Sequence, residues 1–139
     1  MHAVSHDGRF GKGLAAKVEE KYQVREQFLK DKGRGCPGLS VVHNPERTIV
    51  NLVTKLKYYE KPIPTDVAHT IYLLKEWMSI SQIKTVCMPA ISCGLDEMKL
   101  EDVVAMLYKE FQQTDDTIYM YLSSTWNNKG GEHQQNLCG

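Results

Sequence analysis

The segment 48–54 reads TIVNLVT, and a run of β-branched and aliphatic residues of this kind is typical of a buried strand. The segment 39–43, LSVVH, has the same character. Between them stands Asn44-Pro45-Glu46-Arg47, whose residue types favour a turn. We therefore predict a hairpin or two neighbouring strands over these segments.

Helical and extended patterns alternate on both sides of this pair. The clearest helical patterns have apolar residues three or four positions apart, as in Leu100, Val103, Val104, Leu107 and Phe111. The further predicted elements are a strand at 2–5, helices at 14–22 and 24–32, a helix at 66–79, a strand at 84–88, a helix at 100–111 and a strand at 117–122. This order predicts a layered α/β domain with a mixed sheet.

Length and composition limit the classes of protein that this chain can represent. A chain of 139 residues with 42% hydrophobic residues is expected to form about one globular domain. We predict that domain over 1–122, followed by a polar, disordered tail over 123–139. The 17 basic and 17 acidic residues balance, which argues against a protein that coats DNA or RNA. The chain has no apolar run of membrane-spanning length and no secretory signal pattern, so we expect no membrane association.

The cysteines and histidines do not follow a metal-binding pattern. Cys36, Cys87, Cys93 and Cys138 form no CxxC pair, and the five histidines are scattered, so we expect no metal. Without an export signal, the cysteines are interpreted as reduced thiols of a protein in the nucleus, the cytoplasm or both.

Two glycine-containing loops follow predicted strands, at 6–13 and 89–96. In α/β sheets, ligands bind beyond the carboxyl ends of the strands, where such loops lie. Gly11-Lys12-Gly13 precedes a helix, so its backbone can approach a phosphate closely. The same string is more typical of a simple glycine-rich turn before a helix.

Three side chains near these strand ends carry possible chemistry. Asp96 can act as a general acid or base, or can merely cap a helix or turn. Cys93 can be a nucleophile, but no histidine stands beside it in sequence, and we interpret it as a small loop residue. Lys55 ends a strand and can be a nucleophile, or can be an ordinary surface lysine.

Four strings together resemble the macrodomain family. HAVS at 2–5 and GKGLA at 11–15 look like the family's first ligand loop, and MPAISCGLD at 88–96 looks like its phosphate-binding loop. With LVTK at 52–55, the ending CGLD is similar to one branch, the terminal ADP-ribose protein glycohydrolases, which also deacetylate O-acetyl-ADP-ribose. The resemblance implies a three-layer α/β/α sandwich with a mixed sheet. Since the chain starts beyond the family's first strand, we expect the sandwich to lack that strand.

The same resemblance implies an activity. A member of this branch is a hydrolase that removes ADP-ribose from ADP-ribosylated Glu or Asp of proteins. By resemblance, the Lys55 amine attacks C1″ of the distal ribose, and Asp96 moves the protons when the covalent adduct breaks down. No cofactor is implied. The alternative is a non-catalytic module that only binds ADP-ribose, although such a module would not need a nucleophilic lysine.

The resemblance also implies a set of binding residues and partners. The expected contacts to the distal ribose and phosphates are Ser5, Gly11, Lys12, Gly13 and Leu14. Those expected in the loop around the diphosphate are Pro89, Ile91, Ser92, Cys93, Gly94 and Leu95. The expected partners are ADP-ribose or O-acetyl-ADP-ribose and mono-ADP-ribosylated proteins, bound by a monomer.

Overall fold

A mixed three-stranded sheet forms the centre of the molecule in the computed structural model, which describes residues 1–10, 13–89 and 98–121. The strand order is β1 (His2–Ser5), β3 (Thr48–Lys55) and β2 (Gly38–His43). β1 runs parallel to β3, whereas β2 runs antiparallel to β3. The two neighbouring strands predicted from 39–43 and 48–54 are thus confirmed as an antiparallel pair.

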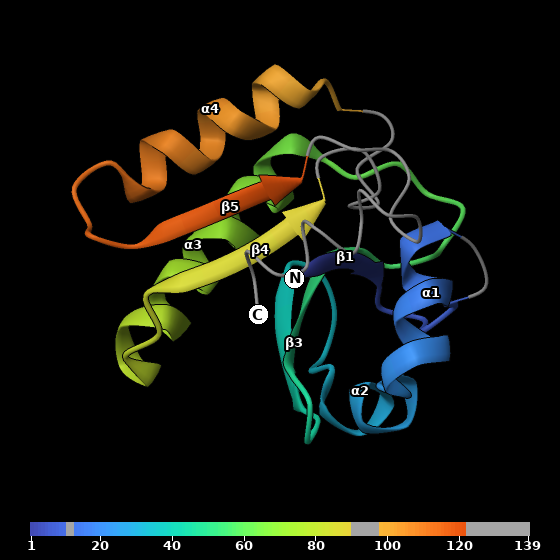
Figure 1. Ribbon diagram of the computed structural model, residues 1–139. Helices are drawn as coiled ribbons and strands as arrows, with labels where there is room; N and C mark the ends of the chain where they lie inside the picture. Colours follow the sequence, from blue (N-terminus) through green and yellow to red (C-terminus); the bar gives the residue numbers. More distant parts are fainter. Residues whose placement is uncertain (11–12, 90–97, 122–139) are drawn as a thin grey trace.

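A second, parallel pair of strands continues this layer. It consists of β4 (Thr85–Pro89) and β5 (Thr117–Tyr121). The amine of Met1, just before β1, donates a hydrogen bond of 2.5 Å to the carbonyl oxygen of Cys87 in β4, which joins the two sheets. In Figure 1 the arrowheads of β4 and β5 point toward the side of the molecule where the helix after β1 lies.

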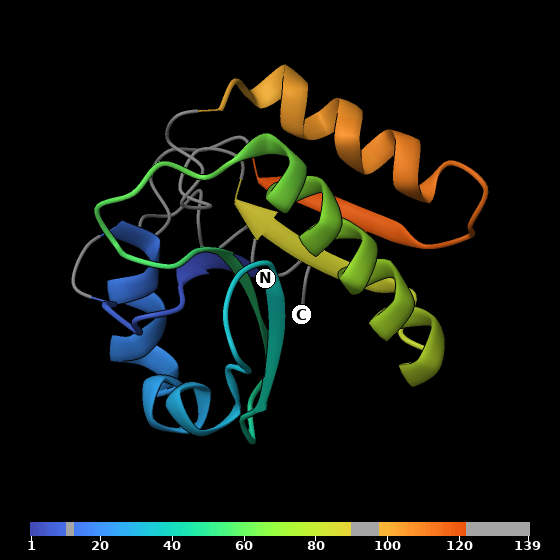
Figure 2. The ribbon, with the colours of Figure 1, turned by 180° about the vertical axis from the view of Figure 1, so that it is seen from behind.

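Helices cover both faces of the strand layer. α1 (Gly13–Tyr22) and α2 (Arg25–Asp31) lie on one face, and α3 (Pro64–Ser81) and α4 (Leu100–Phe111) lie on the other (Figures 1 and 2). The result is the three-layer α/β/α sandwich that the sequence predicted. No helix in the described part of the chain has the length and apolar character of a membrane span.

The two faces of the layer enclose two separate cores, because successive side chains of a strand point to opposite faces. Ala3 of β1 and Leu52 of β3 pack toward α3 and α4, while Val4 and Val53 pack toward α1 and α2. The core under α3 and α4 also contains Val50, Val67, Ile71, Leu74, Met78, Val86, Met88, Val103, Leu107 and Phe111. Val103, Leu107 and Phe111 of the stripe predicted for α4 therefore become contacts that fix the helix in place, as the buried residues of α3 do. Leu100 and Val104 of that predicted stripe are exposed instead.

A row of polar side chains crosses the three-stranded sheet inside the protein. His2, Asn51 and Ser40 are neighbours in register on β1, β3 and β2, and each is at most 1% exposed. Nε2 of His2 lies 2.6 Å from Oδ1 of Asn51, and the imidazole meets the ring of Phe10 edge-on. Burial, together with the nearby N-terminal amine, lowers the pKa of His2 to about 4 despite the hydrogen bond to Oδ1 of Asn51, which raises it.

The cysteines correct one expectation from the sequence. Cys36 is a free thiol, and burial together with the charge of Asp66 raises its pKa to about 11. Cys87, in contrast, is disulfide-bonded, so the prediction that all cysteines are reduced is wrong for this residue. Spacing along the chain could not show this, because disulfide pairing depends on distance in the folded protein.

Candidate active site

Lys55 lies at the carboxyl end of β3, beside the end of β1. Ser5 is its partner in the parallel register, after a shift between Val4 and Ser5. The N–H of His6 donates a 2.8 Å hydrogen bond to the carbonyl oxygen of Lys55. The Lys55 side chain is half-buried at this end of the sheet. The lysine proposed from the sequence thus stands at the strand edge where α/β proteins bind ligands.

Asp7 connects the loop after β1 to the loop after β3. Its Oδ1 accepts hydrogen bonds from Oγ of Ser5 at 2.5 Å and from the N–H of Arg9 at 3.2 Å. Its Oδ2 accepts a 3.0 Å hydrogen bond from the N–H of Tyr58, which is 51 residues away in sequence. The N–H of Asp7 itself donates to the carbonyl oxygen of Leu56 at 3.0 Å. One residue therefore joins the two chain segments that flank Lys55.

The charge of Asp7 is stabilised by the same contacts. Partial burial raises the pKa of this carboxyl group, but the hydrogen bonds from Ser5, Tyr58 and Arg9 and the positive charge of Lys57 outweigh burial. The net effect lowers the pKa of Asp7 below its ordinary value. Asp7 is therefore an ionised hydrogen-bond acceptor at neutral pH.

Basic side chains near α2 hold the β1–α1 loop from its other side. Nε of Arg25 donates to the carbonyl oxygen of Gly8 at 2.6 Å, and Nζ of Lys32 donates to that of His6 at 2.8 Å. Gly8 has a φ of 72°, and a Cβ there would lie 2.6 Å from Cδ2 of Leu29. The positive φ therefore favours glycine at this position, and a larger residue would also displace the end of the Leu29 side chain.

The surface beside Lys55 carries an excess of positive charge. The two segments 6–10 and 55–61 contain four lysine or arginine residues and two acidic residues. The guanidinium group of Arg9 lies 4.5 Å from the ring centre of Tyr58, whose ring in turn meets that of Tyr59 edge-on. A positive surface of this kind attracts anionic ligands.

The structure describes part of the set of residues predicted to bind the ligand. Gly13 and Leu14 are the first residues of α1, and Pro89 is the last residue of β4. The other predicted residues lie outside the described part of the chain, namely Gly11, Lys12, Ile91, Ser92, Cys93, Gly94, Leu95 and Asp96. The pairing of Lys55 with Asp96 therefore stays a prediction.

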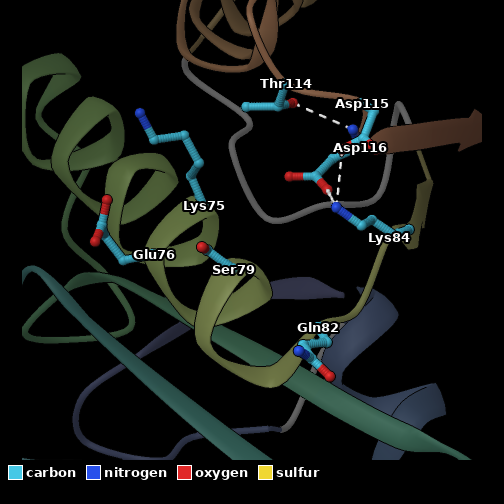
Figure 3. Close-up of a pocket in the computed structure, with 8 residues that line it drawn as sticks. All are labelled: Lys75, Glu76, Ser79, Gln82, Lys84, Thr114, Asp115 and Asp116. Atoms are coloured by element: carbon cyan, nitrogen blue, oxygen red, sulfur yellow. Dashed lines mark hydrogen bonds and ion pairs between the residues drawn. The ribbon is translucent and has the colours of Figure 1, made fainter.

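A hollow at the opposite end of the strand layer differs in its charges from the surface beside Lys55. It has a volume of about 490 Å³ and lies between α3 and the turn before β5 (Figure 3). Its lysines are paired with carboxylates, since Nζ of Lys75 lies 2.9 Å from Glu110 and Nζ of Lys84 lies 2.8 Å from Asp115. Lys84 and Asp116 directly precede β4 and β5, so the hollow lies at the amino ends of these strands. Paired charges at this end make it a poor site for a diphosphate.

Sequence reasoning missed the residues that join the two loops. Asp7 and Arg9 lie in the glycine-containing loop predicted at 6–13, and no role for Tyr58 was predicted. Only an Asp-Gly pair directly after a predicted strand marked Asp7 as a turn residue. No group of three His, Cys, Asp or Glu side chains within 1–10, 13–89 and 98–121 is arranged to hold a metal ion.

Comparison with known proteins agrees with this architecture, although no family model matches the chain. The human ADP-ribose glycohydrolase OARD1 is 28% identical over 120 residues, which cover 86% of this chain and 78% of the relative. The macrodomain of Mycobacterium tuberculosis DarG superposes with a TM-score of 0.76 and 23% identity, over 88% of this chain and 87% of that one. Thermosipho africanus DarTG, solved in complex with ADP-ribose, superposes with a TM-score of 0.70 and 18% identity, over 94% of this chain and 39% of that one.

The three-layer arrangement, with these structural neighbours, defines the fold class: the chain has the macrodomain fold. Within this fold, its sequence similarity is to the branch of ADP-ribose glycohydrolase OARD1, represented by the human and bovine proteins. Both conclusions confirm the resemblance seen in the four sequence strings.

Proposed function

We propose that this protein is an ADP-ribosyl-ester hydrolase that releases ADP-ribose from modified Glu or Asp side chains of proteins. The observation that carries the proposal is the place of Lys55, half-buried at the carboxyl end of β3 and in register with Ser5. The similarity to ADP-ribose glycohydrolase OARD1 supports the substrate class. The excess of basic residues beside Lys55 favours a diphosphate ligand.

The start of α1 supports the same ligand. This helix is ten residues long and begins at Gly13, the first helix in sequence after β1 ends at Ser5. The unpaired N–H groups of a helix N-terminus favour phosphate oxygens. In the proposed complex, this turn binds a phosphate while the distal ribose extends toward Lys55.

The proposed reaction has two steps. The neutral amine of Lys55 attacks C1″ of the distal ribose, so that a C–N bond forms and the bond from C1″ to the ester oxygen breaks. The carboxylate of the target protein leaves, and the lysine nitrogen loses a proton to a base. Water then attacks C1″ of the adduct, which returns the amine to Lys55 and releases ADP-ribose. In this proposal Asp96 moves the protons when the adduct breaks down.

O-Acetyl-ADP-ribose fits the same reaction. Acetate replaces the protein carboxylate as the leaving group, while the rest of the ligand is unchanged. We therefore propose that both esters are substrates.

Replacement of Lys55 tests the proposal. The wild-type protein is incubated with a protein that is ADP-ribosylated on Glu, and free ADP-ribose is measured by mass spectrometry. We expect Lys55→Ala to lower turnover at least 100-fold, since it removes the nucleophile, and to leave ADP-ribose binding measured by calorimetry within about threefold. Mass spectrometry of the intact wild-type protein should also show a lysyl adduct that is missing from the variant.

The matched control is Lys84→Ala. This exposed lysine lies at the opposite end of the strand layer and pairs with Asp115, so its loss should leave turnover unchanged. Wild-type binding of ADP-ribose without turnover would instead favour the non-catalytic binding module. Comparable turnover by Lys55→Ala would exclude the lysine nucleophile.

A further inference from the structure

We propose that Asp7 is a positioning residue, which fixes the place of the Lys55 amine by holding the β3–α3 loop against the β1–α1 loop. This inference rests on the proposed function, because it assigns Asp7 a part in the reaction of Lys55. The carboxylate of Asp7 acts on the backbone that follows Lys55.

The backbone around Lys55 is held by contacts with the β1–α1 loop. Lys55 is the last residue of β3, so its orientation depends on the residues that follow it. The carbonyl oxygens of Lys55 and Leu56 accept hydrogen bonds from the N–H groups of His6 and Asp7. Tyr58 then donates its own N–H to Oδ2 of Asp7. The chain at and just beyond the proposed nucleophile is therefore held by the β1–α1 loop at Lys55, Leu56 and Tyr58.

Asp7 is itself anchored through both of its carboxylate oxygens. Its two carboxylate oxygens accept hydrogen bonds from different chain segments. Oδ2 accepts from Tyr58 in the loop after β3, while Oδ1 accepts from Ser5 at the end of β1 and from Arg9 in the loop after it. Ser5 is buried and belongs to β1, so the carboxylate is fixed to the sheet. A carboxylate bound at both oxygens cannot rotate without losing a hydrogen bond.

A third contact reinforces the same connection. The guanidinium group of Arg9 lies over the ring of Tyr58, so the two residues that donate backbone N–H groups to Asp7 also meet through their side chains. The hydrogen bond from Tyr58 to Asp7 and the contact between Arg9 and the Tyr58 ring both join the β1–α1 loop to the β3–α3 loop. Displacement of Tyr58 would therefore move the backbone directly beyond Lys55, and small misplacements of a reacting group reduce rates strongly.

The test variant is Asp7→Asn, which keeps the shape of the side chain. An amide has one acceptor oxygen, so its NH₂ group must face a backbone N–H on one of the two sides. The variant therefore breaks the connection at Tyr58 or at Ser5 and Arg9. The matched control is Glu60→Gln, since Oε1 of Glu60 accepts the N–H of Lys57 at 2.6 Å without leaving its own loop.

The measurements separate positioning from folding. For Asp7→Asn we expect kcat to fall at least tenfold, with KM for the ADP-ribosylated protein and the Kd of ADP-ribose within threefold of wild type. Hydrogen exchange of the Tyr58 amide, measured by NMR, should become faster in Asp7→Asn and stay unchanged in Glu60→Gln. A kcat of Asp7→Asn within threefold of wild type overturns the proposal, as does an equal loss of kcat in Glu60→Gln.

The outcomes also distinguish this inference from the proposed function. Wild-type protein without turnover overturns the hydrolase and, with it, the part of Asp7 in catalysis. In that case the exchange rate of the Tyr58 amide still decides whether Asp7 holds the two loops together. Unchanged exchange in Asp7→Asn overturns that connection even if the wild-type enzyme is active.

Discussion

At the residue scale, His2 makes the stability of this protein depend on pH. Its imidazole is buried and hydrogen-bonded to Asn51, and burial lowers its pKa to about 4, below the ordinary value of 6.5. The unfolded chain therefore binds a proton at His2 between pH 6.5 and 4, whereas the folded chain does not. The stabilising effect of a neutral His2 is complete above pH 6.5 and is lost as the pH falls to about 4.

The expected size of this effect is about 3 kcal/mol in the free energy of unfolding, from about 1.4 kcal/mol per pKa unit. Urea unfolding at pH 7 and pH 4.5 measures it in the wild type and in His2→Gln, which can still donate to Asn51 but cannot titrate. The variant should lose less stability on acidification than the wild type. His43→Gln, at an exposed position of β2, is the control and should behave as the wild type does. Equal acid sensitivity of wild type and His2→Gln would contradict the prediction.

At the scale of the element, α3 connects the sheet to α4. Leu74 is 0% exposed and belongs to the core that contains residues of β3, β4 and α4. We expect Leu74→Ala to lower the free energy of unfolding by about 2–5 kcal/mol, since it leaves a cavity between three elements. Chemical denaturation measures the change. Ile80→Ala, at an 82% exposed position of the same helix, should change stability by less than about 0.5 kcal/mol.

The elements themselves could be predicted because their signals are local. α3 follows from Val67, Ile71, Leu74 and Met78, which repeat at helical spacing, and the helix begins at Pro64, two residues before the predicted start. β2 and β3 follow in the same way from runs of β-branched residues. Contacts between distant segments leave no such pattern, so neither the hydrogen bond from Tyr58 to Asp7 nor the disulfide of Cys87 could be predicted.

The candidate site was predicted only in part, for the same reason. The sequence placed Lys55 at a strand end, and the structure adds its neighbour Ser5 in the parallel register. Which residue lies beside Lys55 depends on which strands pair, and strand pairing is determined by the whole sheet. The role of Asp96 and the extent of the domain over 1–122 stay predictions.

At the scale of the whole molecule, ligand binding should raise the thermal stability of the protein. ADP-ribose that binds only the folded state should stabilise it by about 2.7 kcal/mol at a concentration 100 times Kd. A thermal melt with and without ADP-ribose measures this as a rise in Tm, with adenosine as the comparison ligand that lacks the diphosphate and distal ribose. An equal rise with adenosine, or no rise with ADP-ribose, would contradict binding through the diphosphate end.

Together with the proposed function, the hydrogen bonds from Arg25 and Lys32 to the carbonyl oxygens of Gly8 and His6 predict that the α2 region influences substrate choice. A substitution at either basic residue would shift the β1–α1 loop while every residue predicted to line the ligand stayed the same. We therefore expect substitutions in a neighbouring helix to change the ester preference of the proposed hydrolase, which gives engineering a starting point outside the residues predicted to line the ligand.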